Sequence, residues 1–137
     1  MIVQDLFERD AVAIGGFENL TTASQLMREK NVSFLVVVEP GFDNQLKPVG
    51  VLTDRDIVRS VVAREADSRA LRVDDVMTRD PLIAQPADDL LDAERRMRQL
   101  GVRRVPVVGD GGELLGVLSL DDILDGLVEQ PRLGALA

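Results

Sequence analysis

The chain contains one pattern twice, and this internal repeat restricts its folds more than any other feature of the sequence. Three segments of the first half recur in the second half: 3–14 as 73–84, 20–38 as 90–108 and 50–58 as 116–124. The spacing is 70 residues for the first two pairs and 66 for the last, because the loop EPGFDNQLKPV is four residues longer than its counterpart GDGGELL. Surface loops tolerate such insertions at small cost. The repeat therefore predicts two copies of one supersecondary unit.

Each copy has the pattern expected of a β-α-β-β-α unit. In the second copy Leu90, Ala93, Met97 and Leu100 fall on one face of a helix. The short valine-rich runs that follow the helix in each copy are typical of strands. Beyond these helices, the expected elements are extended segments at 11–15 and 81–85, strands at 34–38, 105–108 and about 114–118, and final helices at about 54–65 and 120–129.

The fold class that we expect is α+β, with two pseudo-symmetric β-α-β-β-α motifs packed through their sheets into one module. We assign residues 1–66 to the first motif and 67–137 to the second. A unit of about 65 residues buries only a small core and is marginal alone, so the two sheets are expected to cover each other. Asn31 and Gly101, which both tolerate left-handed backbone, are expected to end the first helix of each motif.

The composition narrows the classes of function. The 24 acidic and 16 basic residues give a net charge of −8, which disfavours non-specific binding to nucleic acids and anionic membranes. The absence of Cys and His removes thiolate metal sites, the Cys nucleophile and the commonest general base. The opening MIVQDLFERD has no apolar signal-peptide core, and no stretch reaches bilayer length. We therefore expect a cytoplasmic protein that is not an enzyme and has no nucleic-acid or membrane partner.

The corner from strand to helix is the segment with the clearest chemistry. Thr53 and Asp56, like Ser119 and Asp122, have the spacing of a capping box, in which hydroxyl and carboxylate satisfy the first backbone N–H groups of a helix. A glycine three residues before each hydroxyl is not needed for capping and indicates close approach of another group to the backbone. A helix start with a hydroxyl and a carboxylate also suits the phosphate and ribose of a nucleotide. Capping and nucleotide binding are compatible, and both interpretations stay open.

A cluster of acids at Asp88, Asp89 and Asp92 has two interpretations. The carboxylates could bind a metal ion, or they could form the solvated first turn of the helix that follows. The spacing is not that of an EF-hand loop, and acidic residues are favourable at a helix start. We favour the helix turn and expect no metal site.

The chain resembles tandem CBS motifs that form a Bateman module. The resemblance rests on GVLTDRDIV and GVLSLDDIL at the two corners, on VDDVMTRDPLIA, and on GVRRVPVVGDGGELLG, and it covers about residues 3–130. It implies a regulatory module that binds adenosyl ligands, such as AMP, ADP, ATP or S-adenosylmethionine, in clefts between the two motifs. In such a module each cleft takes its hydroxyl and acid from one corner and its adenine pocket from the other motif.

The resemblance implies two sets of cleft residues. Asp56 and Asp122 would hold ribose hydroxyls, and Thr53 and Ser119 would face phosphate. The first cleft would comprise Val51, Thr53, Arg55, Asp56, Ser33, Thr78, Ile83, Val102 and Arg103. The second cleft would comprise Val117, Ser119, Asp122, Ala13, Val32 and Ser33.

The two clefts differ in charge. Where the first cleft has Thr78, the second has Glu8 at the matching position, and a carboxylate near an anionic ligand is unfavourable unless it is paired. Arg103 and Arg55 beside the first cleft are able to offset phosphate charge. We therefore expect the cleft of Thr53 and Asp56 to bind the more tightly.

The leading hypothesis is a stand-alone CBS pair that senses an adenosyl ligand and acts in trans on a regulated protein, with homodimerisation expected from the resemblance. Transmission of this kind requires a ligand with different affinities for two states of the module. The alternative is a ligand-free module that mediates protein–protein assembly. In that case the corners would be caps only.

Overall fold

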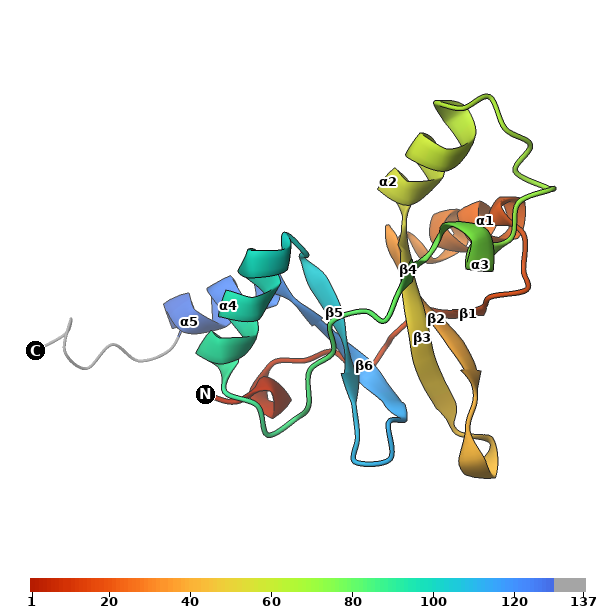
Figure 1. The fold of residues 1–137 in the computed structure, drawn as a ribbon. Helices are drawn as coiled ribbons and strands as arrows, with labels where there is room; N and C mark the ends of the chain where they lie inside the picture. Colours follow the sequence, from red (N-terminus) through yellow and green to blue (C-terminus); the bar gives the residue numbers. More distant parts are fainter. Residues whose placement is uncertain (130–137) are drawn as a thin grey trace, which may run out of the picture.

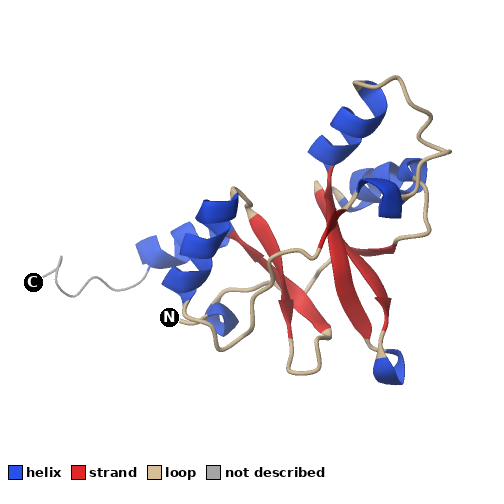
Figure 2. Cartoon of the chain, viewed as in Figure 1, coloured by secondary structure: helices blue, strands red, loops and turns tan. Residues whose placement is uncertain are grey.

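The computed structural model describes residues 1–129, which form two helix-on-sheet halves whose sheets face each other (Figures 1 and 2). The strands lie towards the middle of the molecule and the helices lie on the outside (Figure 2). The helical elements are η1 (Val3–Asp5), α1 (Leu20–Lys30), η2 (Phe42–Asn44), α2 (Asp54–Ile57), η3 (Val58–Val62), α3 (Val73–Val76), α4 (Leu90–Leu100) and α5 (Leu120–Glu129). The strands are β1 (Ala13–Gly15), β2 (Phe34–Pro40), β3 (Leu46–Thr53), β4 (Thr78–Arg79), β5 (Arg104–Val108) and β6 (Leu114–Ser119).

The two sheets are built on matching hairpins. One sheet has the order β1-β2-β3-β4, with β1 parallel to β2 and the other pairs antiparallel, and the other sheet pairs β5 with β6 in antiparallel fashion. Phe34, Val36 and Val38 of β2 are buried between the sheets, where they pack against Val51 and Val117 among others. The predicted packing of two repeated motifs through their sheets is confirmed.

The outer face of each sheet is covered by amphipathic helices. In the first half Leu20, Ala23 and Met27 of α1 are buried against the sheet, and Leu90, Ala93 and Met97 of α4 are buried in the same way in the second half. These two helices have 11 residues each. No helix among residues 1–129 combines the length and the apolar character that crossing a bilayer requires.

Both helices end where the sequence predicts. Asn31 and Gly101 take left-handed backbone conformations, with φ of 54° and 68°, and each donates its N–H back into the last turn. At Gly101 this conformation costs little because the residue has no side chain, and asparagine is the non-glycine residue that tolerates it well.

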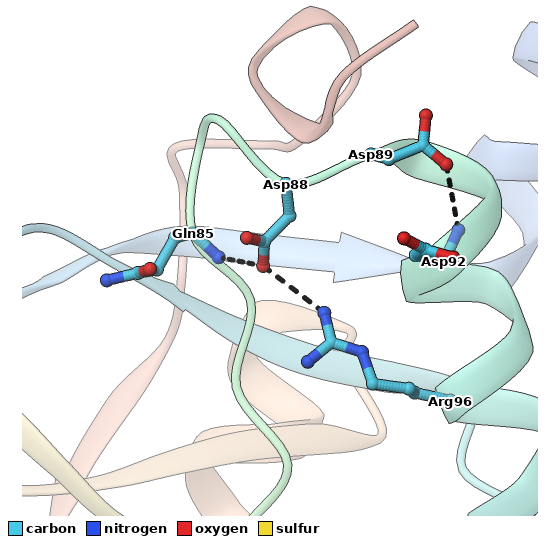
Figure 3. Close-up of polar contacts among 5 residues, drawn as sticks. All are labelled: Gln85, Asp88, Asp89, Asp92 and Arg96. Atoms are coloured by element: carbon cyan, nitrogen blue, oxygen red, sulfur yellow. Dashed lines mark hydrogen bonds and ion pairs between the residues drawn. The ribbon is translucent and has the colours of Figure 1, made fainter.

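The acids at the start of α4 are engaged in building the helix (Figure 3). Asp89 caps α4 by accepting the Asp92 N–H at 3.1 Å, and Asp88 accepts the Gln85 N–H at 2.9 Å and an Arg96 N–H at 3.3 Å (Figure 3). The arrangement is that of a capped helix start with a supported turn before it.

The halves exchange their leading segments. The N-terminal segment lies beside α4 of the second half (Figure 1). Its Val3 is fully buried in the core that contains Leu90 and Met97. Conversely, Val73 of α3 is buried in the core of the first half. Each segment also extends a sheet: the N–H of Glu8 donates to the carbonyl of Val117 at 2.9 Å, just as β4 pairs with β3. Each hydrophobic core therefore combines one motif with the leading segment of the other motif.

Two expected elements differ in detail from the sequence prediction. The segment 81–85 forms a single bridge to β5, in which the Ala84 N–H donates to the Pro106 carbonyl at 2.9 Å. The next bonds of a parallel ladder would need N–H groups at Pro86 and Pro106, and proline has none, so the ladder cannot extend in either direction. The helix expected at 54–65 is α2 followed by the π-helical segment η3, after which the Ala63 N–H donates to the Val58 carbonyl at 2.9 Å.

Candidate functional site

A cavity of about 640 Å³ lies between the halves, beside the corner that joins β3 to α2. Its walls come from three parts of the chain: the corner with the start of β2, the segment that follows β4, and the segment between α4 and β5. The lining residues are Ser33, Phe34, Val51, Thr53, Asp54, Arg55, Asp56, Thr78, Asp80, Pro81, Leu82, Leu100, Gly101, Val102, Arg103, Arg104 and Val105. The cavity is therefore cross-built from the first corner and the second motif.

Most of the residues that were predicted for the first cleft lie in this lining. They are Ser33, Val51, Thr53, Arg55, Asp56, Thr78, Val102 and Arg103. Ile83 does not line the cavity and is 41% exposed. Its neighbour Leu82 lines the cavity instead.

Sequence reasoning missed several lining residues. Asp80, Pro81 and Leu82 follow the predicted Thr78 directly, and Arg104 follows Arg103. Phe34, which matches Arg104 at the 70-residue spacing, also lines the cavity and was missed in the same way. Extending the 70-residue alignment by one residue beyond the positions carried over would have found Arg104.

The first corner is a complete capping box. Thr53 Oγ1 accepts the Asp56 N–H at 3.2 Å, and Asp56 Oδ2 accepts the Thr53 N–H at 2.9 Å. Within residues 1–129 no hydrogen bond uses Asp56 Oδ1, and the Thr53 hydroxyl acts only as an acceptor. Both groups therefore retain polar capacity toward the cavity while they cap the helix.

The backbone N–H groups of the first turn of α2 are already engaged. The Asp54 N–H donates to the Ser33 carbonyl at 3.0 Å, and the Arg55 N–H donates to Asp54 Oδ1 at 2.8 Å. With the bond from the Asp56 N–H to Thr53 Oγ1, all three first-turn amides that were candidates for binding phosphate are hydrogen-bonded within the chain. Side chains are the remaining donors for an anion at this corner.

The charges around the cavity are mixed. Arg55, Arg103 and Arg104 line it together with three acids, which are Asp54, Asp56 and Asp80. Arg103 has an acid partner outside the cavity, because one of its terminal nitrogens donates to Asp121 Oδ1 at 2.8 Å. The side chains of this pair are 65% and 63% exposed, so the ion pair contributes little stability.

The repeat and the cavity agree with a family match. The model of the CBS domain matches residues 3–63 and again residues 73–129. The chain belongs to the CBS-domain family. The predicted identity and fold class are therefore confirmed, with two CBS motifs forming one pair.

Named relatives support the same family. The CBS domain-containing protein YhcV of Bacillus subtilis is 33% identical over 121 residues, which cover 88% of this chain and 81% of YhcV. The chain spans 60%, 53% and 41% of three further curated relatives, which is about half of their length.

Solved structures of CBS proteins have the same fold. The hexameric CBS-CP12 protein from bloom-forming cyanobacteria superposes with a TM-score of 0.80 at 32% identity, covering 97% of this chain and 73% of that chain. The CBS domain pair of protein MJ0100, crystallised with 5′-methylthioadenosine and S-adenosyl-L-methionine, has a TM-score of 0.80 at 19% identity. That likeness covers 96% of this chain and 98% of the MJ0100 pair, and it shows a shared fold.

The residues predicted for the second cleft of the CBS pair are more dispersed. Ala13 and Val117 pack in the core between the sheets, and Ser33 lines the first cavity. Val32 lines a groove between α1 and α2 instead. The cavity described above thus includes only Ser33 of this set, along with none of the polar groups of the second corner.

The second corner keeps only part of the cap. Ser119 Oγ accepts the Asp122 N–H at 3.0 Å, as Thr53 does for Asp56. Within residues 1–129 no hydrogen bond runs from the Ser119 N–H to the Asp122 carboxylate. The Asp122 side chain is therefore not fixed by the cap in the way that Asp56 is.

Proposed function

We propose that this CBS pair binds an adenosyl ligand, such as AMP, ADP, ATP or S-adenosylmethionine, in the cavity at the first corner and regulates a partner protein in trans. The observation that carries the proposal is the meeting of Thr53 and Asp56 with Thr78, Val102 and Arg103 around one cavity. Its volume of about 640 Å³ is within the range of small-molecule sites. We propose binding and regulation as the role, without catalysis.

The chemistry of the lining fits each part of such a ligand. We expect Asp56 Oδ1 to accept hydrogen bonds from ribose hydroxyls, since the cap uses only Oδ2. The Thr53 hydroxyl is able to donate to a phosphate oxygen while it accepts the backbone N–H. Val51, Leu82 and Val102 offer apolar contacts for adenine. Methylthioadenosine and S-adenosylmethionine in the MJ0100 complex belong to the same class of ligand.

The second cleft is proposed as the weaker site. Glu8 pairs through its backbone with Val117 there, at the position that Thr78 holds in the first cleft. A carboxylate at this place opposes an anionic ligand. We expect this cleft to favour a less charged ligand or to bind weakly.

Assembly is a second candidate function, and apolar side chains exposed on two helices favour it. Val58 and Val62 on η3 are 54% and 67% exposed, and Leu124 and Val128 on α5 are 47% and 66% exposed. The two valines of η3 and the two apolar residues of α5 are each four residues apart, and we propose that these exposed side chains contribute to a homodimer contact. The CBS-CP12 relative forms hexamers.

A titration separates the two functions. We expect AMP, ATP or S-adenosylmethionine to raise the Tm of the protein, because a ligand that binds only the folded state stabilises it by mass action. Asp56→Asn keeps the side-chain volume but removes the charge, and we expect it to weaken binding by tenfold or more, since hydrogen bonds to a carboxylate contribute about 1.5–3 kcal/mol.

Asp122→Asn is the matched control for this experiment. It makes the same change at the second corner, and we expect it to leave the tight binding step unchanged in isothermal titration calorimetry. If no adenosyl compound shifts the Tm of the wild-type protein, ligand sensing is wrong and assembly becomes the better function.

A further inference from the structure

We propose that Asp121 is a specificity-determining residue, because it competes with the phosphate of a bound ligand for the guanidinium of Arg103. The inference rests on the proposed adenosyl-binding function and adds a selectivity to it. In this view, the second CBS motif lowers the preference of the first cavity for phosphate-bearing ligands over uncharged ones.

Arg103 is in a position to contact both Asp121 and a ligand in the cavity. Arg103 lines the cavity of the first corner, yet its guanidinium donates at 2.8 Å to Asp121 in the first turn of α5. The backbone holds the two residues together, because the Leu120 N–H donates to the Arg103 carbonyl at 2.7 Å. Asp121 therefore stays beside Arg103 whether or not the side chains are paired.

The donors left at the first corner make Arg103 important for phosphate. The first-turn amides of Asp54, Arg55 and Asp56 are engaged within the chain, so an incoming phosphate depends on the Thr53 hydroxyl and on arginine side chains. Among the ion pairs of residues 1–129, only one involves a cavity arginine, and that arginine is Arg103.

The corresponding position of the first corner has the opposite charge. Asp121 matches Arg55 at the 66-residue spacing, so the same place in the corner is basic in one motif and acidic in the other. A carboxylate beside Arg103 both neutralises the guanidinium and repels a phosphate that approaches it. An uncharged ligand tail experiences neither effect, which makes the consequence selective.

The exposure of the pair sets the size of the effect. Both side chains are about two-thirds exposed, at 65% and 63%, so the interaction is screened by water and salt. We expect removal of the Asp121 charge to tighten binding of a phosphate-bearing ligand by about two- to fivefold, the range that exposed ion pairs support.

The test compares AMP with adenosine, which share base and sugar and differ by the phosphate. Isothermal titration calorimetry at low salt would give both Kd values for the wild-type protein, for Asp121→Asn and for Asp125→Asn. Asp125→Asn removes the same charge from the same helix and controls for general electrostatics. We expect Asp121→Asn to tighten AMP binding alone and Asp125→Asn to leave the ratio of the two Kd values unchanged.

A second background tests the route through Arg103. In Arg103→Gln protein we expect weaker AMP binding and a smaller effect of Asp121→Asn, because only the direct repulsion between Asp121 and the phosphate remains. The proposal is overturned if Asp121→Asn leaves the AMP-to-adenosine ratio unchanged, or shifts it equally in the Arg103→Gln background, while wild-type binding still depends on Asp56. If the wild-type protein binds neither AMP nor adenosine, this selectivity is wrong, and the proposed function is wrong as well only if ATP and S-adenosylmethionine also fail to bind.

Discussion

The first and second corners share a backbone design and differ in what surrounds it. Thr53 and Asp56 form a reciprocal capping box beside a large cavity. At the second corner, Ser119 caps α5 by accepting the Asp122 N–H, and within residues 1–129 no bond returns from the Ser119 N–H to the Asp122 carboxylate. The helix after the first corner changes to π winding at Val58, whereas α5 is α-helical from Leu120 to Glu129. The turn is thus preserved in both copies, whereas the side chains and the helix around it differ.

The largest expected effect tests whether the two halves are one cooperative unit. Leu52 and Leu118 are matching residues of the repeat, and both are fully buried in separate cores. We expect Leu52→Ala and Leu118→Ala each to lower the free energy of unfolding by about 2–5 kcal/mol. Chemical denaturation followed by circular dichroism should show one transition that shifts in both variants.

Leu52→Met and Leu118→Met serve as controls, because they nearly conserve the side-chain volume and should cost less than about 1.5 kcal/mol. The expectation of one cooperative unit is wrong if Leu118→Ala splits unfolding into two transitions, one of which keeps the wild-type midpoint concentration of denaturant. That result would mean that the halves unfold independently.

A smaller effect is expected at the glycines before the two corners. A Cβ added to Gly116 would lie 2.0 Å from the Glu8 carbonyl oxygen, which is fixed by its hydrogen bond to Val117. At Gly50 the nearest atom, at 2.5 Å, is the sulfur of the flexible Met77 side chain, although the Thr78 carbonyl oxygen is also close, at 2.9 Å. We expect Gly116→Ala to cost about 1–3 kcal/mol, and more than Gly50→Ala.

Thermal unfolding of the two alanine variants measures this difference. Gly101→Ala is a control of another kind, because no atom lies near its added Cβ and only the positive φ opposes the change. Equal losses at Gly50 and Gly116 would show that the two exchanged segments are held with the same rigidity.

The smallest effect concerns the caps themselves. We expect Thr53→Ala to lower the free energy of unfolding by about 1 kcal/mol, because a cap hydroxyl satisfies a backbone N–H that otherwise lacks a partner. Ser119→Ala should cost less, since the second corner lacks the reciprocal bond in the described residues. Urea denaturation without ligand measures both values, and a larger loss for Ser119→Ala would contradict the ranking of the two corners.

The repeat allowed much of the fold to be predicted from the sequence. It gave the order of elements, the helix ends at Asn31 and Gly101, and the packing of the sheets, because each depends on local patterning that occurs twice. The exchange of leading segments could not be predicted, since the pattern of Val3 or Val73 shows that a residue is buried but does not show in which core.

The residues of the candidate site could also be predicted in part from the sequence. The capping-box spacing at Thr53 and Asp56 was readable, and the resemblance to CBS motifs joined it to Thr78 and Arg103. The hydrogen bonding of the first-turn amides could not be predicted from the sequence, because the Asp54 N–H donates to the carbonyl of Ser33, a residue distant in the sequence. The pair of Arg103 with Asp121 was missed for the same reason.

The burial of Val3 in the second core has a practical consequence for handling the protein. Removal of residues 1–9 would expose the apolar interior beside α4, which is about 80 residues away in the sequence. A protease acting near the N-terminus would therefore loosen α4 and β6 before it disturbed the neighbouring helix α1. Mechanical pulling on the first residue would likewise strain the C-terminal CBS motif first.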